Sequence, residues 1–168
     1  MFALGHLGLG KAIATPLYRR FDRRAKSAFL VGTLLPDLID KPLYYAASWW
    51  TGKQGEALGL ISGTHTFGHT GLLLAALGGA ALITRAAPAR ALALGVATHL
   101  LLDVVGLSLD RGTLLWPLLG WRFPFYPFSG LHQHLGTVMR PVTLVGEVLG
   151  AGFLWWDYRR VKRSAVPR

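Results

Sequence analysis

Long apolar stretches recur along the chain and are separated by segments rich in polar or aromatic residues. Their length and the absence of strand-like alternation predict helices rather than strands. The five expected helices cover residues 2–18, 26–40, 66–84, 90–107 and 141–158. Pro16 is expected to kink or shorten the first helix, and Pro36 the second. The pattern therefore predicts an all-α bundle of about five helices.

Composition indicates that lipid is the solvent for much of this bundle. Hydrophobic residues make up 52% of the chain and charged residues 15%, against about 25% charged residues in typical soluble domains. The mean hydropathy is +0.38. The 168 residues leave room for a single domain, and the absence of cysteine excludes disulfides and thiolate metal ligands. We therefore expect residues 1–168 to form a single integral membrane domain.

The basic residues are placed at the ends of apolar segments. The net charge is +10, and the clusters lie at 19–26, 85–90 and 159–163. This is the positive-inside pattern of a multi-pass membrane protein, with the basic ends in the cytoplasm, and no nucleic-acid partner is expected. The connections 41–65 and 108–140 then lie outside. Their tryptophans are typical of interfacial loops, and the candidate anchors are Trp49, Trp50, Trp116 and Trp121.

Ionisable residues interrupt the apolar stretches at similar depths. The segment "GVATHLLLDVVGL" (95–107) carries His99 and Asp103 four residues apart, on one face of a helix. A rise of 1.5 Å per residue, counted from the basic end of each helix, places such residues of all five helices about 14–24 Å deep. They are His6, Asp37, Asp40, His69, His99, Asp103 and Glu147. We therefore expect them to meet in one layer, in the outer half of the membrane.

A shared metal ion accounts for this layer. Each unpaired charge in hydrocarbon costs at least about 2.5–3.5 kcal/mol, whereas ligands around a cation are neutralised together. Histidine and carboxylate without thiolate suit zinc, and also manganese or iron. The pairs with suitable helical spacing are His65/His69, His99/Asp103 and Asp37/Asp40. Other classes remain open: a metal- or proton-translocating protein, a haem-binding protein, or a non-catalytic scaffold whose helices are joined by hydrogen bonds.

Five short motifs resemble one known family. They are "GH" (5–6), "LLPDLIDKP" (34–42), "GTHTFGHT" (63–70), "ATHLLLDVVG" (97–106) and "LLWPL" (114–118), in this order. The sequence resembles the YdjM-type family of bacterial and archaeal membrane-bound metal-dependent hydrolases, whose site pattern is similar to zinc-dependent phospholipase C. The resemblance implies a prokaryotic inner membrane location and one to three metal ions. It implies ligand roles for His6, Asp37, His69, His99 and Asp103, and makes His65 and Asp40 neighbours or ligands of a second ion.

The chain departs from the family pattern at three threonines. Thr66 and Thr70 stand where many members have arginine and serine. The phospholipase pattern ends with a histidine four residues before a glutamate, and here Thr143 precedes Glu147 at that spacing. A complete three-metal phospholipase site is therefore not expected, although "LHQHL" offers two further imidazoles in the outer loop, His132 and His134.

The expected function is hydrolysis of a phosphoester in a membrane lipid or lipid-linked substrate. A bound divalent ion acidifies water and polarises a phosphoryl oxygen. Asp40 or Asp103 is the expected general base, and Glu147 is a further candidate near the metal. Guanidinium groups of the outer loop suit the substrate phosphate, and the candidates are Arg111, Arg122 and Arg140.

Overall fold

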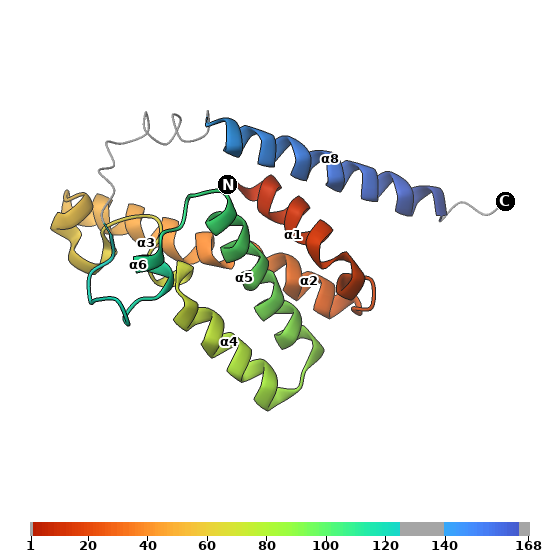
Figure 1. Ribbon diagram of the computed structural model, residues 1–168, viewed down its shortest axis with the longest axis horizontal. Coiled ribbons are helices and arrows are strands. Elements are labelled where there is room, and N and C mark those ends of the chain that lie inside the picture. The colour runs from red at the N-terminus through yellow and green to blue at the C-terminus, as the bar shows by residue number, and fades with distance from the viewer. Residues whose placement is uncertain (1, 125–139, 165–168) are drawn as a thin grey trace.

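A computed structural model describes residues 2–124 and 140–164, and these residues form helices and turns with no strand among them (Figure 1). The all-α prediction is thus confirmed for this part of the chain. The helices are α1 (Ala3–Tyr18), α2 (Arg23–Gly32), α3 (Leu35–Thr51), α4 (Gly71–Thr84), α5 (Ala87–Val105), α6 (Arg111–Leu114) and α8 (Pro141–Ser164). Two 3-10 segments, η1 (Gly55–Ile61) and η2 (Phe67–His69), precede α4.

The predicted helix 26–40 is two helices that meet at a break. Helix α2 ends at Gly32, and α3 begins two residues after Thr33 with Pro36 in its first turn. Proline suits the first turn of a helix because it lacks the N–H that would remain unpaired there. Helix α3 then continues to Thr51 and ends at Gly52, whose φ of 67° is left-handed. The prediction of a connection from residue 41 was therefore wrong for 41–51.

The predicted helix 66–84 begins five residues later than expected. Helix α4 starts at Gly71 because the Thr70 hydroxyl accepts a hydrogen bond from the Leu73 N–H at 3.1 Å and caps the helix. The preceding residues 62–70 form turns and the short η2 segment. This irregular segment carries His65 and His69, so both histidines are positioned by a loop rather than by a regular helix face.

Close backbone contacts join α1 to α8 and α2 to α5. Figure 1 shows α8 (blue) running beside α1 (red), and α5 (green) beside both α2 and α4. A Cβ on Gly95 of α5 would lie 2.3 Å from the Phe29 carbonyl oxygen of α2. A Cβ on Gly8 of α1 would lie 2.1 Å from the Gly150 carbonyl oxygen of α8. Small residues at such crossings let helix backbones approach closely, as in many membrane bundles.

Helix α5 is the described helix whose length and apolarity suit a membrane crossing, and half of its apolar window is buried inside the bundle. Helix α4 is apolar but shorter. Among the described helices, length and apolarity thus support a membrane crossing for α5 alone, and the expected multi-pass topology stays a prediction. Large apolar side chains are nevertheless exposed beyond this helix, among them Ile83 at 85% and Trp49 and Trp50 at 84% each. Such surfaces are typical of contact with lipid.

Candidate metal centre

Six of the predicted ligand residues meet at one point of the bundle. His6 comes from α1, Asp37 from α3, His65 and His69 from the segment before α4, and His99 and Asp103 from α5. Their ligand atoms form three overlapping groups, within each of which all atoms lie within 4.8 Å of one another. The groups are His6/His99/Asp103, Asp37/His69/His99 and His65/His69/Asp103. The structure thus brings together residues up to 97 positions apart.

The centre of the cluster is a triangle of three buried ligand atoms. The Nε2 atoms of His69 and His99 are 3.2 Å apart. Asp103 Oδ2 lies 3.2 Å from the His99 Nε2 and 3.5 Å from the His69 Nε2. Ligands 2.0–2.2 Å from a tetrahedral ion are separated by about 3.3–3.6 Å. The spacing of this triangle therefore fits three ligands of one divalent ion.

The other ring nitrogen of each central histidine is fixed by a hydrogen bond. His99 Nδ1 lies 2.8 Å from the Thr33 carbonyl oxygen, an acceptor, so Nδ1 is the donor. His69 Nδ1 likewise donates to Asp40 Oδ2 at 2.7 Å. In the neutral rings both Nε2 atoms then carry lone pairs that point at each other. Two facing lone pairs beside a carboxylate repel one another, and a cation between them removes the repulsion.

Asp40 contacts the cluster through His69, which matches the expectation of a neighbour rather than that of a ligand. Its Oδ2 accepts hydrogen bonds from the Thr66 N–H at 2.6 Å and from His69 Nδ1. Its Oδ1 accepts from the Thr66 hydroxyl at 3.0 Å and the Gly68 N–H at 2.8 Å. These four donors engage both oxygens of Asp40, and Asp40 belongs to none of the three groups of ligand atoms, so the contacts do not support a role as metal ligand or general base. It orients His69 instead, as carboxylates behind metal-binding histidines commonly do.

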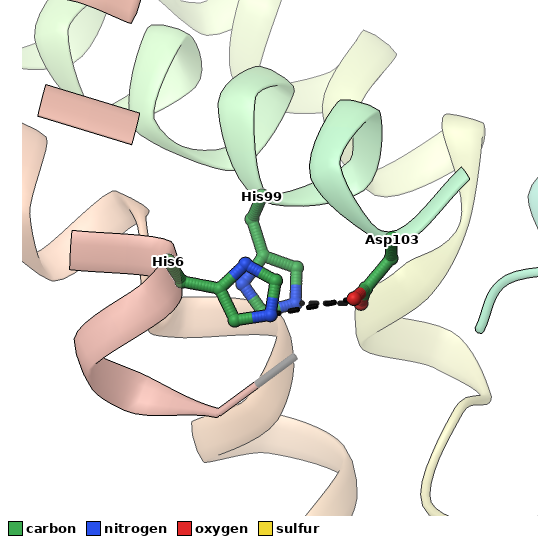
Figure 2. A group of neighbouring side chains, drawn as sticks. All are labelled: His6, His99 and Asp103. Atoms are coloured by element: carbon green, nitrogen blue, oxygen red, sulfur yellow. Dashed lines mark ion pairs between the residues drawn. The ribbon is translucent and has the colours of Figure 1, made fainter. Parts of the chain in front are cut away.

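His6 supplies a buried imidazole whose nitrogens make no hydrogen bond within the described part of the chain. Its side chain is fully buried, and its ring stacks on that of His99 at 3.8 Å. Figure 2 shows both rings pointing toward Asp103, with His6 Nε2 at 3.3 Å from Asp103 Oδ1. A buried polar group without a hydrogen bond is costly unless something else satisfies it. A cation held with Asp103 would do so.

Two further groups complete the polar surroundings. Asp37 Oδ1 lies 3.6 Å from the His69 Nε2, while its Oδ2 is paired with Lys41 Nζ at 2.5 Å. His65 packs edge-on against His69 with ring centroids 4.4 Å apart. Burial lowers the pKa of His65 to about 3, so this imidazole is neutral at physiological pH and keeps a lone pair for a cation. Asp37 and His65 are thus available as outer members of the centre.

A cavity of about 290 Å³ lies directly beside the cluster. Its wall includes His65 and two basic residues, Lys41 and Arg140. Apolar side chains such as Phe2 and Val142 form much of the rest. The cavity therefore combines an imidazole of the cluster, two cationic groups and an apolar surface, an arrangement that suits an anionic group attached to a hydrophobic molecule.

Three other predicted site residues lie elsewhere. Glu147 belongs to none of the three groups. Its Oε1 instead accepts hydrogen bonds from the N–H groups of Phe2 and Gly5 at 2.7 and 3.0 Å. It thus caps the start of α1 from α8, where a negative charge also favours the helix dipole. Arg111 and Arg122 are exposed and do not line the cavity. The interpretation of Glu147 as a metal-site residue is not supported by these contacts.

The predicted contribution of His132 and His134 falls outside the described residues. The structure also adds groups that the sequence did not single out. The Ser108 hydroxyl donates to Asp103 Oδ1 at 2.8 Å, and the Thr33 carbonyl orients His99. Ser108 lies three residues after the end of α5. A hydroxyl in this position can reach back to the last turn of the helix, so the sequence could have indicated its contact with Asp103. No sequence signal identifies a backbone carbonyl such as that of Thr33.

The fold and the cluster together define a helical protein with a buried histidine–aspartate centre suited to a metal ion. The family model described as YdjM inner membrane protein matches residues 1–162. The chain belongs to this family, and the resemblance seen in the motifs is confirmed. The family description also supports an inner membrane location. No curated protein and no solved structure matches the chain.

Proposed function

We propose that this protein is a metal-dependent hydrolase of the inner membrane that cleaves a phosphoester in a lipid or lipid-linked substrate. The observation that carries the proposal is the buried triangle of His69, His99 and Asp103 beside a cavity with two basic residues. A divalent ion at such a site acidifies water and polarises a phosphoryl oxygen. Zinc suits this donor set, and manganese or iron also accepts two imidazoles and a carboxylate.

The chain's own residues have distinct tasks in this proposal. His69, His99 and Asp103 hold the ion, with Asp37 at hand as a fourth ligand. A second ion that shares Asp103 would be held by His6 beside His99, or by His65 beside His69, because the two imidazoles fall in different groups of ligand atoms. Asp103 faces three imidazoles and acts as a ligand in this arrangement, so the proposal names no separate general base among the carboxylates. Asp40 is assigned a positioning role because it holds His69 in one tautomer.

The cavity beside the centre would bind the substrate. Lys41 and Arg140 line it, and both groups donate to phosphate oxygens. Arg140 therefore remains the favoured phosphate ligand among the three arginines considered, since it reaches the cavity wall. The apolar part of the wall suits the hydrocarbon of a lipid. The metal centre would face the outer half of the membrane if the basic ends face the cytoplasm.

The geometry of the cluster distinguishes between two alternative functions, haem binding and metal translocation. A bis-histidine haem needs its two imidazoles on opposite faces of a wide macrocycle. The rings of His6 and His99 instead stack at 3.8 Å, and the nitrogens of His69 and His99 are 3.2 Å apart. This argues against haem. A metal-translocating protein remains compatible with the ligand set, and metal flux in liposomes without phosphate release would favour it.

Hydrolysis by the purified full chain tests the proposal. The probes are a chromogenic phosphodiester and a phospholipid in mixed micelles, each measured with added zinc, with added manganese and after treatment with a chelator. We expect turnover that is abolished by the chelator, restored by one metal and absent in Asp103→Ala. Turnover that is unaffected by the chelator and by Asp103→Ala would contradict the proposal.

A further inference from the structure

A second cavity lies along the C-terminal half of α1, away from the His/Asp cluster. It has a volume of about 350 Å³ and is formed by α1, the start of α2 and the end of α8. Tyr18 in its wall follows His6 by twelve residues, or about 18 Å along the helix. The charged residues in the wall are Lys11, Arg19, Lys26, Asp157 and Arg160.

Positive charge is in excess in this cavity. Four of the charged wall residues are basic and only Asp157 is acidic. Asp157 is already paired, because its Oδ2 accepts from Lys11 Nζ at 2.6 Å. Both partners are half-buried, with 18% and 23% of the side chain exposed. Lys11 is neutralised in this way, and the wall offers no second carboxylate to Arg19 and Lys26.

The Tyr18 ring contacts the ammonium groups of both Lys11 and Lys26. Lys11 Nζ lies 5.0 Å from the centroid of the Tyr18 ring, and Lys26 Nζ lies 5.9 Å from it. Each contact is a favourable cation–π interaction, but the two like charges repel each other. No carboxylate of the described residues forms an ion pair with Lys26. An anion in the cavity would compensate Lys26 and relieve the repulsion.

We propose that this cavity binds a phosphate group. Ammonium and guanidinium donors on several sides match the oxygens of a phosphate, and the volume exceeds that of a single water-sized void. The phosphate belongs either to the headgroup of an anionic phospholipid or to a soluble phosphate. Exposed Trp155 and Trp156 lie on α8 next to Asp157, where tryptophan is typical of the membrane interface. The site uses none of the residues of the metal centre, so it stands independently of the hydrolase proposal.

Binding by the full-length protein in detergent tests this site with two probes. The first probe is an anionic phospholipid at low mole fraction in mixed micelles, with a zwitterionic phospholipid as the reference. The second probe is inorganic phosphate, read out as a shift of the thermal unfolding midpoint. The test variant is Arg19→Gln/Lys26→Gln. The matched control is Arg23→Gln/Arg24→Gln, which removes the same charge from exposed residues of α2 that do not line the cavity.

We expect the wild-type protein to bind at least one of the two probes, the anionic phospholipid or inorganic phosphate. The test variant should weaken binding at least about tenfold, because each cation removed gives up a charge-assisted hydrogen bond to the phosphate. The control removes only screened surface charge and should change binding less than about threefold. Retention of the anionic lipid alone assigns the phosphate to a headgroup, and stabilisation by inorganic phosphate assigns it to a soluble ligand. Equal losses in the two double variants, or no binding of either probe to the wild type, would overturn the proposal. Circular dichroism checks that the variants fold, and the single variants Arg19→Gln and Lys26→Gln repeat the test should the double variant not fold.

Discussion

The Nε2 atoms of His69 and His99 face each other at 3.2 Å across the middle of the bundle. Neither atom can donate to the other in the neutral rings, because both Nδ1 atoms already donate, to Asp40 and to the Thr33 carbonyl. The two imidazoles come from η2 and α5. This pairing of lone pairs, with Asp103 at the third corner, is the reason to expect a metal ion there.

Removal of one corner of the triangle should release the metal. We expect the wild-type protein to bind at least one divalent ion per chain and His99→Ala to lose it, since the triangle then keeps only two of its three ligands. Elemental analysis of the purified proteins measures this. Leu101→Ala is the control, because Leu101 lies on the same helix but is 49% exposed. Equal metal content in all three proteins would contradict a metal role for His99.

Asp40→Asn tests a positioning role against a ligand role. The amide keeps the shape of Asp40 but loses the charge that orients His69 through Nδ1. We expect metal affinity to fall about 10–100-fold, as is usual for the partner of a metal-binding histidine. Metal titration of the folded variant measures the affinity. Complete loss of binding, as in His99→Ala, would instead favour direct ligation by Asp40.

Neutralising the basic wall of the substrate cavity should impair turnover without affecting the metal. Lys41→Gln and Arg140→Gln each remove a charged donor beside His65. Loss of one charge-assisted hydrogen bond corresponds to about 10–100-fold in kcat/KM. The readouts are phosphoester hydrolysis and metal content. Lys41→Gln also removes the partner of Asp37, so Arg140→Gln is the cleaner variant.

Arg122→Gln is the matched control for this experiment. Arg122 is exposed and does not line the cavity, so its loss should change kcat/KM less than about twofold. An effect of Arg122→Gln as large as that of Arg140→Gln would indicate a general charge effect. The cavity would then lose its assigned role in phosphate binding.

A single methyl group at the crossing of α2 and α5 should destabilise the fold. A Cβ on Gly95 would lie 2.3 Å from the Phe29 carbonyl oxygen and 2.8 Å from the Thr33 N–H nitrogen. Gly95→Ala must push α2 away and is expected to cost about 1–3 kcal/mol. It should also weaken metal binding, because Thr33 orients His99. Thermal unfolding in detergent and metal content measure the two effects.

Gly78→Ala is the control for this packing prediction. A Cβ on Gly78 of α4 would meet no atom within 4 Å, and alanine favours the helix by about 0.5–1 kcal/mol. We therefore expect Gly78→Ala to be neutral or stabilising. Equal destabilisation by both substitutions would indicate that the effect at Gly95 does not come from the close approach of α2 and α5.

Glu147→Ala separates a capping role from a catalytic one. The substitution leaves the N–H groups of Phe2 and Gly5 without their acceptor, at an expected cost of about 0.5–2 kcal/mol in stability. Metal content and turnover per folded molecule should remain within about twofold of the wild type. Loss of turnover in a protein that is stably folded would restore Glu147 to the active site.

Much of the fold followed from local pattern. The expected helices 2–18, 90–107 and 141–158 differ by a few residues from α1, α5 and α8, because apolar runs and prolines act locally on the chain. The break between α2 and α3 was only partly predicted. Pro36 indicated a kink. Helix α3 nevertheless continues to Thr51 through apolar and aromatic residues that are compatible with either a helix or an interfacial loop.

The sequence alone predicted that histidines and aspartates from separate helices come together, since these residues in apolar helices are costly unless they meet. It also determined the family, through motifs that include His6, Asp37, His69, His99 and Asp103. Only the tertiary structure decided the roles of Asp40 and Glu147. Both are carboxylates at the expected depth. The turn at Gly68 provides N–H donors to Asp40. The crossing of α1 and α8 places Glu147 at the N-terminus of α1. Which donors reach a carboxylate depends on helix rotation and close approach, and residue spacing within one helix does not contain that information.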